Sequence, residues 1–208
     1  MLAGHRRGLQ LAALAGVLLL GLRAPRPHPH AAVQVATPAG PLAVLDGDTL
    51  ALPDGTRVRL PGVDCPETGR PLAAEAARFT AAFVAGRDTS LAPGHPPRDR
   101  YGRALADVRA GGASLSAGLV RAGLAWVYAD EGRGLVALQA EAVAARRGVH
   151  ARLARAGPLP LLCGGGRFHR ADCPLVARQA ARRECCWDVA ALLAAGRAPC
   201  RTCLPWPP

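Results

Sequence analysis

Acidic residues and arginines are concentrated between Leu45 and Glu67, where the chain reads LDGDTLALPDGTRVRLPGVDCPE. Asp46 and Asp48 stand two positions apart in a segment of β character, so both side chains leave the same face of the strand. Carboxylates held this close repel each other unless a cation lies between them. The spacing therefore predicts a cation site, to which Asp64 and Glu67 add further carboxylates.

The same segment contains a turn and two arginines. Pro53-Asp54-Gly55 is a tight-turn signal between two runs rich in Leu, Val and Thr, and it predicts a hairpin whose second strand carries Arg57 and Arg59. Carboxylate and main-chain oxygens suit a hard cation such as Ca²⁺, and a guanidinium grips a phosphate through two hydrogen bonds. Metal-assisted chemistry on a phosphate is one interpretation, and a hairpin with solvated charges is the alternative.

A second charged stretch, DRYGRALA, occupies residues 99–106, and LVRAGLAWVY follows at residues 119–128. Together with DGDT and VRL-x-GVD-x-PE, these ordered motifs resemble the thermonuclease, or staphylococcal-nuclease-like, family over about residues 41–148. The resemblance implies a mainly β fold with α-helices, namely a five-stranded OB-type barrel with packed helices. It also implies Ca²⁺-dependent hydrolysis of phosphodiester bonds in DNA and RNA.

Position by position, the resemblance implies a calcium site in the first motifs. Asp48 and Asp64 match the acidic ligands of the family, and Cys65 falls where a main-chain carbonyl oxygen reaches the metal. Asp46 and Thr49 match supporting positions beside these ligands.

The resemblance implies three catalytic side chains. Glu67 matches the carboxylate that activates or orients the attacking water, and Arg59 and Arg103 match the phosphate-binding pair. Tyr101 matches a supporting tyrosine on the substrate side. The physical roles agree, because a metal and two guanidiniums stabilise charge that grows on the phosphate while Glu67 accepts a proton.

The chain is strongly basic, with a formal net charge of +11, and all of its basic side chains except histidine are arginine. Such a charge favours polyanionic partners, so DNA or RNA is the expected substrate. The base composition of a GC-rich genome is an alternative cause of the arginine excess. We expect a monomer with no small-molecule cofactor.

The first 30 residues are expected to form a signal peptide or a membrane anchor. His5-Arg6-Arg7 precede an uncharged run from Gly8 to Gly21, and Arg23 follows it. The run is shorter than the ~20 residues of a membrane span, and its basic-then-apolar order is typical of a signal peptide. We therefore expect export to the periplasm or the medium, or membrane anchoring if the segment is retained.

The hydrophobic pattern and the turn residues place the secondary structure of the body. Strands are expected at residues 42–46, 49–52, 56–60, 89–91 and 104–108, and helices at residues 71–86, 114–122 and 134–147. The prolines and glycine from Pro93 to Pro97 predict a loop between the last two strands. Trp126 is expected to pack in the core, whereas the place of Tyr128 stays open.

Six of the seven cysteines lie beyond residue 160, which marks a second, small region called here the tail, residues 161–208. His169 and Cys173 form an H-x-x-x-C pair, and Cys200 and Cys203 form a C-x-x-C pair. These four ligands suit a structural Zn²⁺ ion, and so small a region requires some such crosslink. GRAPCRTCLP resembles the zinc-binding module of Ada-type DNA-repair methyltransferases, which has a cysteine where this chain has His169.

Other pairings of the tail cysteines remain open at this point. Cys163 is a rival for the fourth ligand, and Cys185 and Cys186 are expected in a strand, packed or open to oxidation. Disulfides are the alternative to zinc, because an exported chain meets an oxidising environment. The arginines of the tail are expected to help recruit nucleic acid.

The expected organisation has five parts: a signal or anchor at residues 1–30, a linker at 31–40, a nuclease-like OB barrel at 41–150, a linker at 151–160 and the zinc-binding tail at 161–208. Two other functions compete with the nuclease. OB barrels also bind single strands without cutting them, and an anchored barrel would serve partner binding. An intact set of acidic residues and arginines favours the enzyme.

Overall fold

The computed structural model describes residues 37–38, 40, 42–128, 130–155, 161–164, 167–170, 173–177, 184–186 and 188–203. The chain divides into two units, Met1–Ala32 and Val33–Pro208, and every described residue belongs to the second unit. The expected signal or anchor at residues 1–30 therefore lies outside the described residues. Within the described part, no helix has the length and apolar character needed to cross a membrane.

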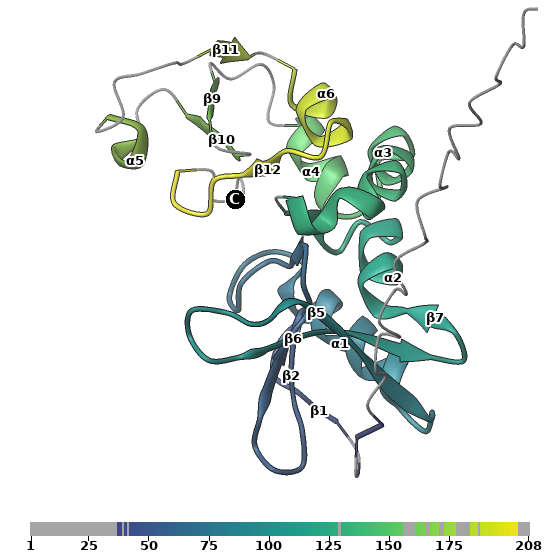
Figure 1. Ribbon diagram of the computed structural model, residues 1–208. Helices are drawn as coiled ribbons and strands as arrows, with labels where there is room; N and C mark the ends of the chain where they lie inside the picture. Colours follow the sequence, from purple (N-terminus) through teal and green to yellow (C-terminus); the bar gives the residue numbers. More distant parts are fainter. Residues whose placement is uncertain are drawn as a thin grey trace, which may run out of the picture. The chain divides into compact units, whose positions relative to one another are not determined.

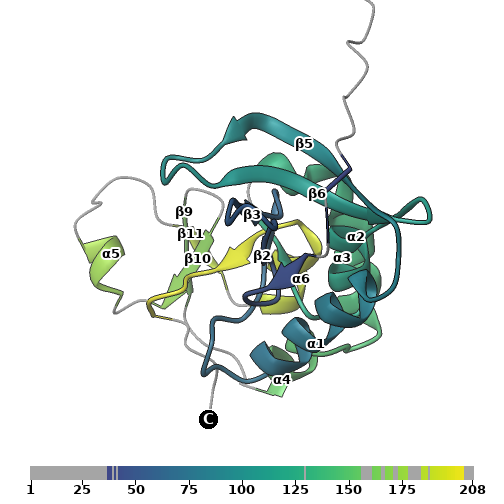
Figure 2. The ribbon, with the colours of Figure 1, turned by 90° about the horizontal axis from the view of Figure 1, so that it is seen from below.

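A mixed sheet forms the body of the fold, and its strand order is β1-β2-β3-β6-β5 with β7 on the outer side of β6. Most neighbours are antiparallel, and β3 and β6 run parallel. In Figure 1 and Figure 2, β5 and β6 lie side by side. The strands are β1 (Ala43–Val44), β2 (Thr49–Ala51), β3 (Arg57–Arg59), β5 (Thr89–Arg98), β6 (Ala104–Ala110) and β7 (Ala113–Ser114).

The predicted hairpin is present, and its register matters for the site. Leu50 faces Val58, and both are fully buried, while Thr49 faces Arg59 on the neighbouring position. Because side chains alternate along a strand, Thr49 and Arg59 share a face that differs from the face of Leu50 and Val58. The hairpin therefore sets the hydroxyl of Thr49 beside the guanidinium of Arg59.

A short second ladder pairs β4 (Val63–Asp64) with β8 (Trp126–Val127). Pro61 has no N–H to donate to a ladder, and Gly62 has φ of 69°, so the chain turns out of the main sheet after β3. The strand pairings of the described residues do not close into the expected five-stranded barrel. They show a mixed sheet with packed helices.

The body contains three of the helices at or near the expected places. Helix α1 (Ala73–Val84) lies within residues 71–86, and α2 (Leu115–Arg121) begins after Ser114, whose side chain accepts a hydrogen bond from the N–H of Ala117 at 3.1 Å. The helix expected at residues 134–147 is present as α3 (Val136–Ala144), and a 3-10 turn, Asp130–Leu135, precedes it.

Helix α4 (Val149–Arg155) follows α3 after a break and enters the region expected to be a linker. Arg146 and Gly148 both have positive φ, 49° and 50°, which the α-helix does not allow. The main-chain N–H of Val149 instead bonds the carbonyl of Gly123 at 2.8 Å. A Cβ on Gly148 would collide with the backbone of Gly123, so glycine permits this close approach.

The expected loop at Pro93–Pro97 is also wrong, since β5 continues from Thr89 to Arg98. Its register to β6 shifts between Pro93 and Arg98. Proline cannot donate to a ladder, and it is tolerated where pairing is irregular. The prolines therefore mark an irregular part of a long strand.

One core fills the space between the sheet and the helices. Its fully buried members include residues of the hairpin, β6 and α2, namely Leu50, Val58, Val108, Leu115, Leu119 and Val120. Trp126, exposed to only 6%, packs with Val149 and with Ala198 of the tail, which confirms its expected place in a core.

The tail has its own sheet, with strand order β11-β9-β10-β12. Its strands are β9 (Leu161–Gly164), β10 (Arg167–Arg170), β11 (Glu184–Cys186) and β12 (Ala198–Pro199), and its helices are α5 (Pro174–Ala177) and α6 (Val189–Ala194). Helix α6 contacts α3 and α4 of the body (Figure 1). The tail therefore shares a packed interface with the body.

Candidate active site

The turn that carries the first acidic pair is held against helix α1. The carbonyl of Gly47 accepts a hydrogen bond from Thr80 Oγ1 at 2.6 Å. A Cβ on Gly47 would lie 2.6 Å from that of Ala76 and 2.8 Å from Cys65 Sγ, so only glycine allows this contact. Asp46 Oδ1 accepts from the N–H of Asp48 at 3.0 Å, which closes the turn.

Asp48 is 6% exposed and has partners on both carboxylate oxygens. Oδ2 accepts from the N–H of Cys65 at 2.6 Å, and Oδ1 accepts from Thr49 Oγ1 at 3.2 Å and lies 3.1 Å from Arg59 Nε. Burial raises the pKa of Asp48 above its ordinary value, although the charge of Arg59 opposes the change. Asp46 and Thr49 thus support Asp48, one through the turn and the other directly.

Arg59 joins the two buried carboxylates. Its Nε faces Asp48, its Nη2 donates to Asp64 Oδ1 at 3.1 Å, and its Nη1 donates to the carbonyl of Leu60 at 2.6 Å. The residue is 8% exposed, so these contacts form in a region of weak solvent screening. The predicted cation site between Asp48 and Asp64 is therefore bridged by a guanidinium.

Asp64 on β4 is 3% exposed and is surrounded by three arginines. Besides Arg59, Arg201 of the tail donates from Nε to Oδ2 at 2.7 Å and from Nη2 to Oδ1. Arg167 Nη2 lies 3.6 Å from Oδ2. Glu67 is mainly exposed, and its Oε1 lies 3.2 Å from Arg201 Nη1. The structure thus brings Arg201 to two predicted site residues.

Arg103 and Tyr101 lie in the turn between β5 and β6, which Asp99 organises. Asp99 Oδ1 accepts from the N–H groups of Tyr101 and Arg103 at 2.9 and 3.0 Å, and Oδ2 accepts from Arg103 Nε at 2.7 Å. Desolvation raises the pKa of Asp99, but these hydrogen bonds outweigh it and hold the pKa below its ordinary value. Tyr101 is 68% exposed, so its ring is open to a ligand.

A cavity of about 420 Å³, called here the arginine cavity, collects these side chains. Its charged lining consists of Arg59, Asp99, Arg100, Arg103, Arg167 and Arg201. Tyr101 and Tyr128 line it as well, and the ring of Tyr128 lies 4.3 Å from the guanidinium carbon of Arg167. Two predicted phosphate-binding residues, Arg59 and Arg103, therefore share one cavity.

Three arginines of this cavity, Arg100, Arg167 and Arg201, were not predicted as site residues. Arg167 and Arg201 stand beyond residue 160, and the sequence marked them only as members of a basic tail. The sequence contained one signal for Arg201, because this residue lies inside the C-x-x-C pair of Cys200 and Cys203. Nothing in the sequence pattern placed that pair beside Asp64.

The residues fit the calcium ion that the resemblance implies. Asp48 and Asp64 are buried carboxylates held against one cationic group, and hard oxygen donors are what Ca²⁺ prefers. Burial raises the pKa of the Cys65 thiol well above its ordinary value, so this side chain stays protonated. Because a protonated thiol is a poor metal ligand, Cys65 is expected to bind the metal through its main-chain carbonyl oxygen.

Four tail residues form a compact cluster of metal-binding groups. The ligand atoms of His169, Cys173, Cys200 and Cys203 all lie within 4.8 Å of one another. Strand β12 runs parallel to β10, and the N–H of Cys200 bonds the carbonyl of Phe168 at 2.9 Å, which sets the C-x-x-C pair beside His169. The predicted Cys₃His set is therefore brought together.

The thiols of this cluster are free and accept hydrogen bonds. None of these three cysteines is in a disulfide. Main-chain N–H groups of Thr202 and Arg170 donate to Cys200 Sγ and Cys203 Sγ at 3.4 and 3.2 Å. Burial raises the pKa of Cys200, but hydrogen bonds from Cys203 and Thr202 outweigh it and lower the pKa overall.

Burial and, next, the charge of Arg167 lower the pKa of His169, which keeps the imidazole neutral and able to bind a metal. The side chains of the rival residues, Cys163, Cys185 and Cys186, lie outside the described residues, although the expected strand at Cys185 and Cys186 is present as β11.

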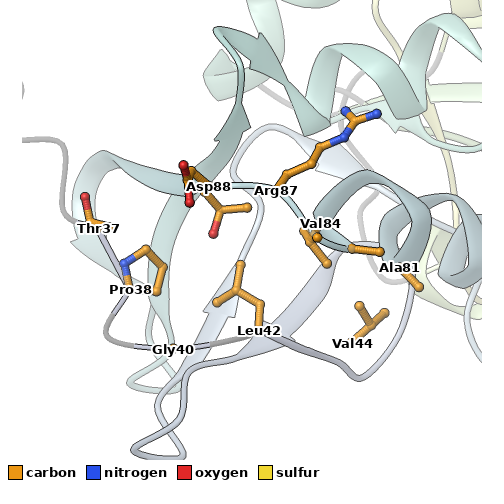
Figure 3. Close-up of a pocket in the computed structure, with 12 residues that line it drawn as sticks. Thr37, Pro38, Gly40, Leu42, Val44, Ala81, Val84, Arg87 and Asp88 are labelled. Atoms are coloured by element: carbon orange, nitrogen blue, oxygen red, sulfur yellow. The ribbon is translucent and has the colours of Figure 1, made fainter.

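A different cavity, of about 590 Å³, lies between the start of the described body, the end of α1 and the start of β5 (Figure 3). Leu42, Val44 and Val84 give it an apolar wall, and Arg87 and Asp88 supply its charges. It contains none of the residues predicted for catalysis or metal binding.

Comparisons with known proteins show the family to which the chain belongs. The family described as staphylococcal nuclease homologue has a model that matches residues 57–152. An uncharacterized endonuclease of Escherichia coli O157:H7 is 37% identical over 112 residues, 51% of this chain and 72% of that protein, and one of Escherichia coli has the same values. The thermonuclease of Staphylococcus intermedius is 38% identical over 91 residues, 39% of this chain and 54% of that protein. The chain therefore belongs to the staphylococcal nuclease homologues and is a nuclease, an enzyme that hydrolyses phosphodiester bonds.

Proposed function

We propose that this nuclease is exported, depends on Ca²⁺ and cuts DNA, RNA or both. The observation that carries the proposal is the bridge at Arg59, which is buried between Asp48 and Asp64 and shares the arginine cavity with Arg103. An arginine that joins two buried carboxylates and also lines an open cavity suits a site for a phosphate and a divalent ion together.

The residues divide the chemistry among them. Asp48, Asp64 and the main-chain oxygen of Cys65 would hold Ca²⁺, which when bound stabilises negative charge on the phosphate. Arg59 and Arg103 bind the phosphate oxygens, and charge-assisted hydrogen bonds to them strengthen as the transition state develops. Glu67 is mainly exposed at the rim, where it accepts a proton from water.

The tail is proposed to be stabilised by one Zn²⁺ ion bound to His169, Cys173, Cys200 and Cys203. Four protein ligands complete a tetrahedral zinc site and leave no position for a reacting water, so the role of this metal is structural. The cluster geometry supports this proposal, since all four ligand atoms already lie within 4.8 Å. The tail arginines would help to recruit nucleic acid.

Export is part of the same proposal. The basic and apolar segment at residues 1–30 supports export. Mass spectrometry of the mature amino terminus distinguishes a cleaved signal from a retained anchor. A mature protein that starts near residue 31 supports secretion, and an intact terminus in the membrane fraction supports anchoring.

The test of the nuclease proposal is hydrolysis of single-stranded DNA and of RNA by the purified chain, with Ca²⁺ and with a chelator. Glu67→Gln and Arg103→Ala should each lower kcat/KM by about 100-fold or more, because each removes a group that acts on the reacting atoms. The matched controls are Glu75→Gln on α1 and Arg121→Ala on α2, which are exposed and absent from the arginine cavity.

The result that would contradict the proposal is equally specific. If the folded chain binds single-stranded DNA and RNA but cuts neither of them with any divalent ion, it is a binding protein built on a nuclease fold. If it cuts at full rate in the chelator, Ca²⁺ is not its metal.

A further inference from the structure

We propose that Arg167 and Arg201 of the tail bind a phosphate of the nucleic-acid strand, so that body and tail together form one composite active site. The inference rests on the proposed nuclease function and specifies which tail residues meet the substrate. It differs from general recruitment, because the two residues line the same cavity as Arg59 and Arg103, the proposed phosphate-binding pair.

Arg201 is held at the acidic edge of this cavity. Its Nε and Nη2 hydrogen-bond the two oxygens of Asp64, and its Nη1 lies 3.2 Å from Glu67. The backbone of Arg201 is held by the tail cluster, because the residue stands between Cys200 and Cys203 in the sequence. With its side chain 50% exposed, part of the guanidinium remains open to a ligand.

Arg167 is preorganised beside it. Its Nη1 donates to the carbonyl of Pro199 at 2.7 Å, its guanidinium carbon lies 4.3 Å from the ring centre of Tyr128, and its Nη2 lies 3.6 Å from Asp64. An arginine held by a carbonyl and a ring loses little side-chain entropy when it binds a ligand. Its remaining N–H groups are those that a phosphate would meet.

The charges around the cavity call for an anion. Five arginines line it, namely Arg59, Arg100, Arg103, Arg167 and Arg201, and Asp99 is the one acid among its described lining residues. Asp64 alone faces three of these guanidiniums. A phosphodiester supplies the missing negative charge with oxygens that match the guanidinium fork.

Likeness to known nucleases does not account for these two residues. The family match covers residues 57–152, and both arginines lie after it. They reach the cavity because α6 packs on α3 and α4 and because Gln139 of α3 donates to the carbonyl of Leu193 in α6. The composite site is thus a property of this arrangement of body and tail.

The test measures binding separately from cleavage. Fluorescence anisotropy follows a labelled single-stranded DNA oligonucleotide on the full chain in a Glu67→Gln background with Ca²⁺, so that the strand stays intact. We expect Arg167→Ala and Arg201→Ala each to weaken binding about tenfold. Each should also reduce the slope of log Kd against log salt by about 0.7, the value for one lost phosphate contact on a single strand.

The matched control is Arg121→Ala, which removes the same charge from an exposed position on α2 that is absent from the lining of the cavity. It should leave the affinity within about twofold and the salt slope within about 0.2. Arg201→Lys should recover part of the affinity, because lysine retains the charge and loses the fork. Such partial rescue is not expected from a residue that serves only to hold the tail in place.

Calcium titration decides against the main rival explanation, in which Arg201 competes with the metal for Asp64. If Arg201→Ala binds Ca²⁺ more tightly by calorimetry and leaves DNA affinity unchanged, Arg201 is an inhibitory contact and the inference is overturned. If the wild type cuts the strand and both variants keep the wild-type salt slope, only the inference is overturned. If the wild type neither binds nor cuts the strand, the proposed function is overturned together with the inference.

Discussion

Replacement of Arg59 by alanine should destabilise the protein strongly, and by an amount that calcium reduces. The change removes the cation that Asp48 and Asp64 share. Asp64 retains Arg201 and Arg167, whereas in the described part of the chain Asp48 has no second ion-pair partner. An uncompensated buried charge costs about 3–5 kcal/mol. Since Asp48 retains hydrogen bonds from Cys65 and Thr49, we expect about 3 kcal/mol.

The assay is urea unfolding at pH 7 in a chelator and again in excess Ca²⁺. In the chelator, Arg59→Ala should unfold with a free energy lower by the full amount. In Ca²⁺ the deficit should shrink, because the metal replaces the lost cation and stabilises the folded state by mass action. Arg57→Ala is the matched control, since Arg57 lies on the same strand but is exposed.

The pH dependence has a definite sign. Burial raises the pKa of Asp48 above 3.8, and the charge of Arg59 opposes this change. The loss of Arg59 therefore raises the pKa of Asp48 further. The folded variant then binds more protons than the unfolded chain, so its stability falls as pH rises through the raised pKa. The deficit should be complete at pH 7 and should shrink in acid. The reasoning would be refuted if Arg59→Ala lost the same free energy of unfolding in the chelator and in Ca²⁺, and if this loss did not change in acid.

Three further changes test the core, the interface and the tail. His150 is buried, its ring nitrogens have no hydrogen-bond partner, and burial lowers its pKa from 6.5 to about 4. The folded state therefore loses up to about 3 kcal/mol as pH falls from 6.5 to 4, and His150→Leu should abolish this loss in acid unfolding. Gln139→Leu leaves the N–H of Val127 and the carbonyl of Leu193 without their partner and should cost about 3 kcal/mol in urea unfolding, and a loss below about 1 kcal/mol would contradict the interface described. Cys203→Ser should remove the zinc detected by native mass spectrometry, and zinc retained at the wild-type level would argue for another ligand.

Local signals predicted the parts of the fold that local physics controls. The turn at Pro53-Asp54-Gly55 and the cap at Ser114 depend on residues within three or four positions, and both are present. The loop expected at Pro93–Pro97 was wrong because proline excludes regular pairing and still allows an irregular strand. The helix expected at residues 134–147 is present as α3, whereas α4 was not expected, because the close contact of Gly148 with Gly123 that separates the two helices joins distant parts of the chain.

The sequence by itself determined which chemistry the protein carries. The types and spacing of Asp48, Arg59 and Asp64 in one short segment specify carboxylates and a guanidinium, and the hairpin register sets Arg59 opposite the residue after Asp48. The sequence also predicted the Cys₃His set, because the two residues of each pair stand only three or four positions apart.

Only the tertiary structure decided that Arg201 meets Asp64, across 137 positions of the chain. That contact depends on how α6 packs on α3 and α4 and on a parallel strand pair in the tail. Such packing follows from the shapes of many side chains at once, and no periodic pattern encodes it. The sequence therefore specified the acidic residues and arginines of the candidate site, and the packed fold decided which further arginines surround them.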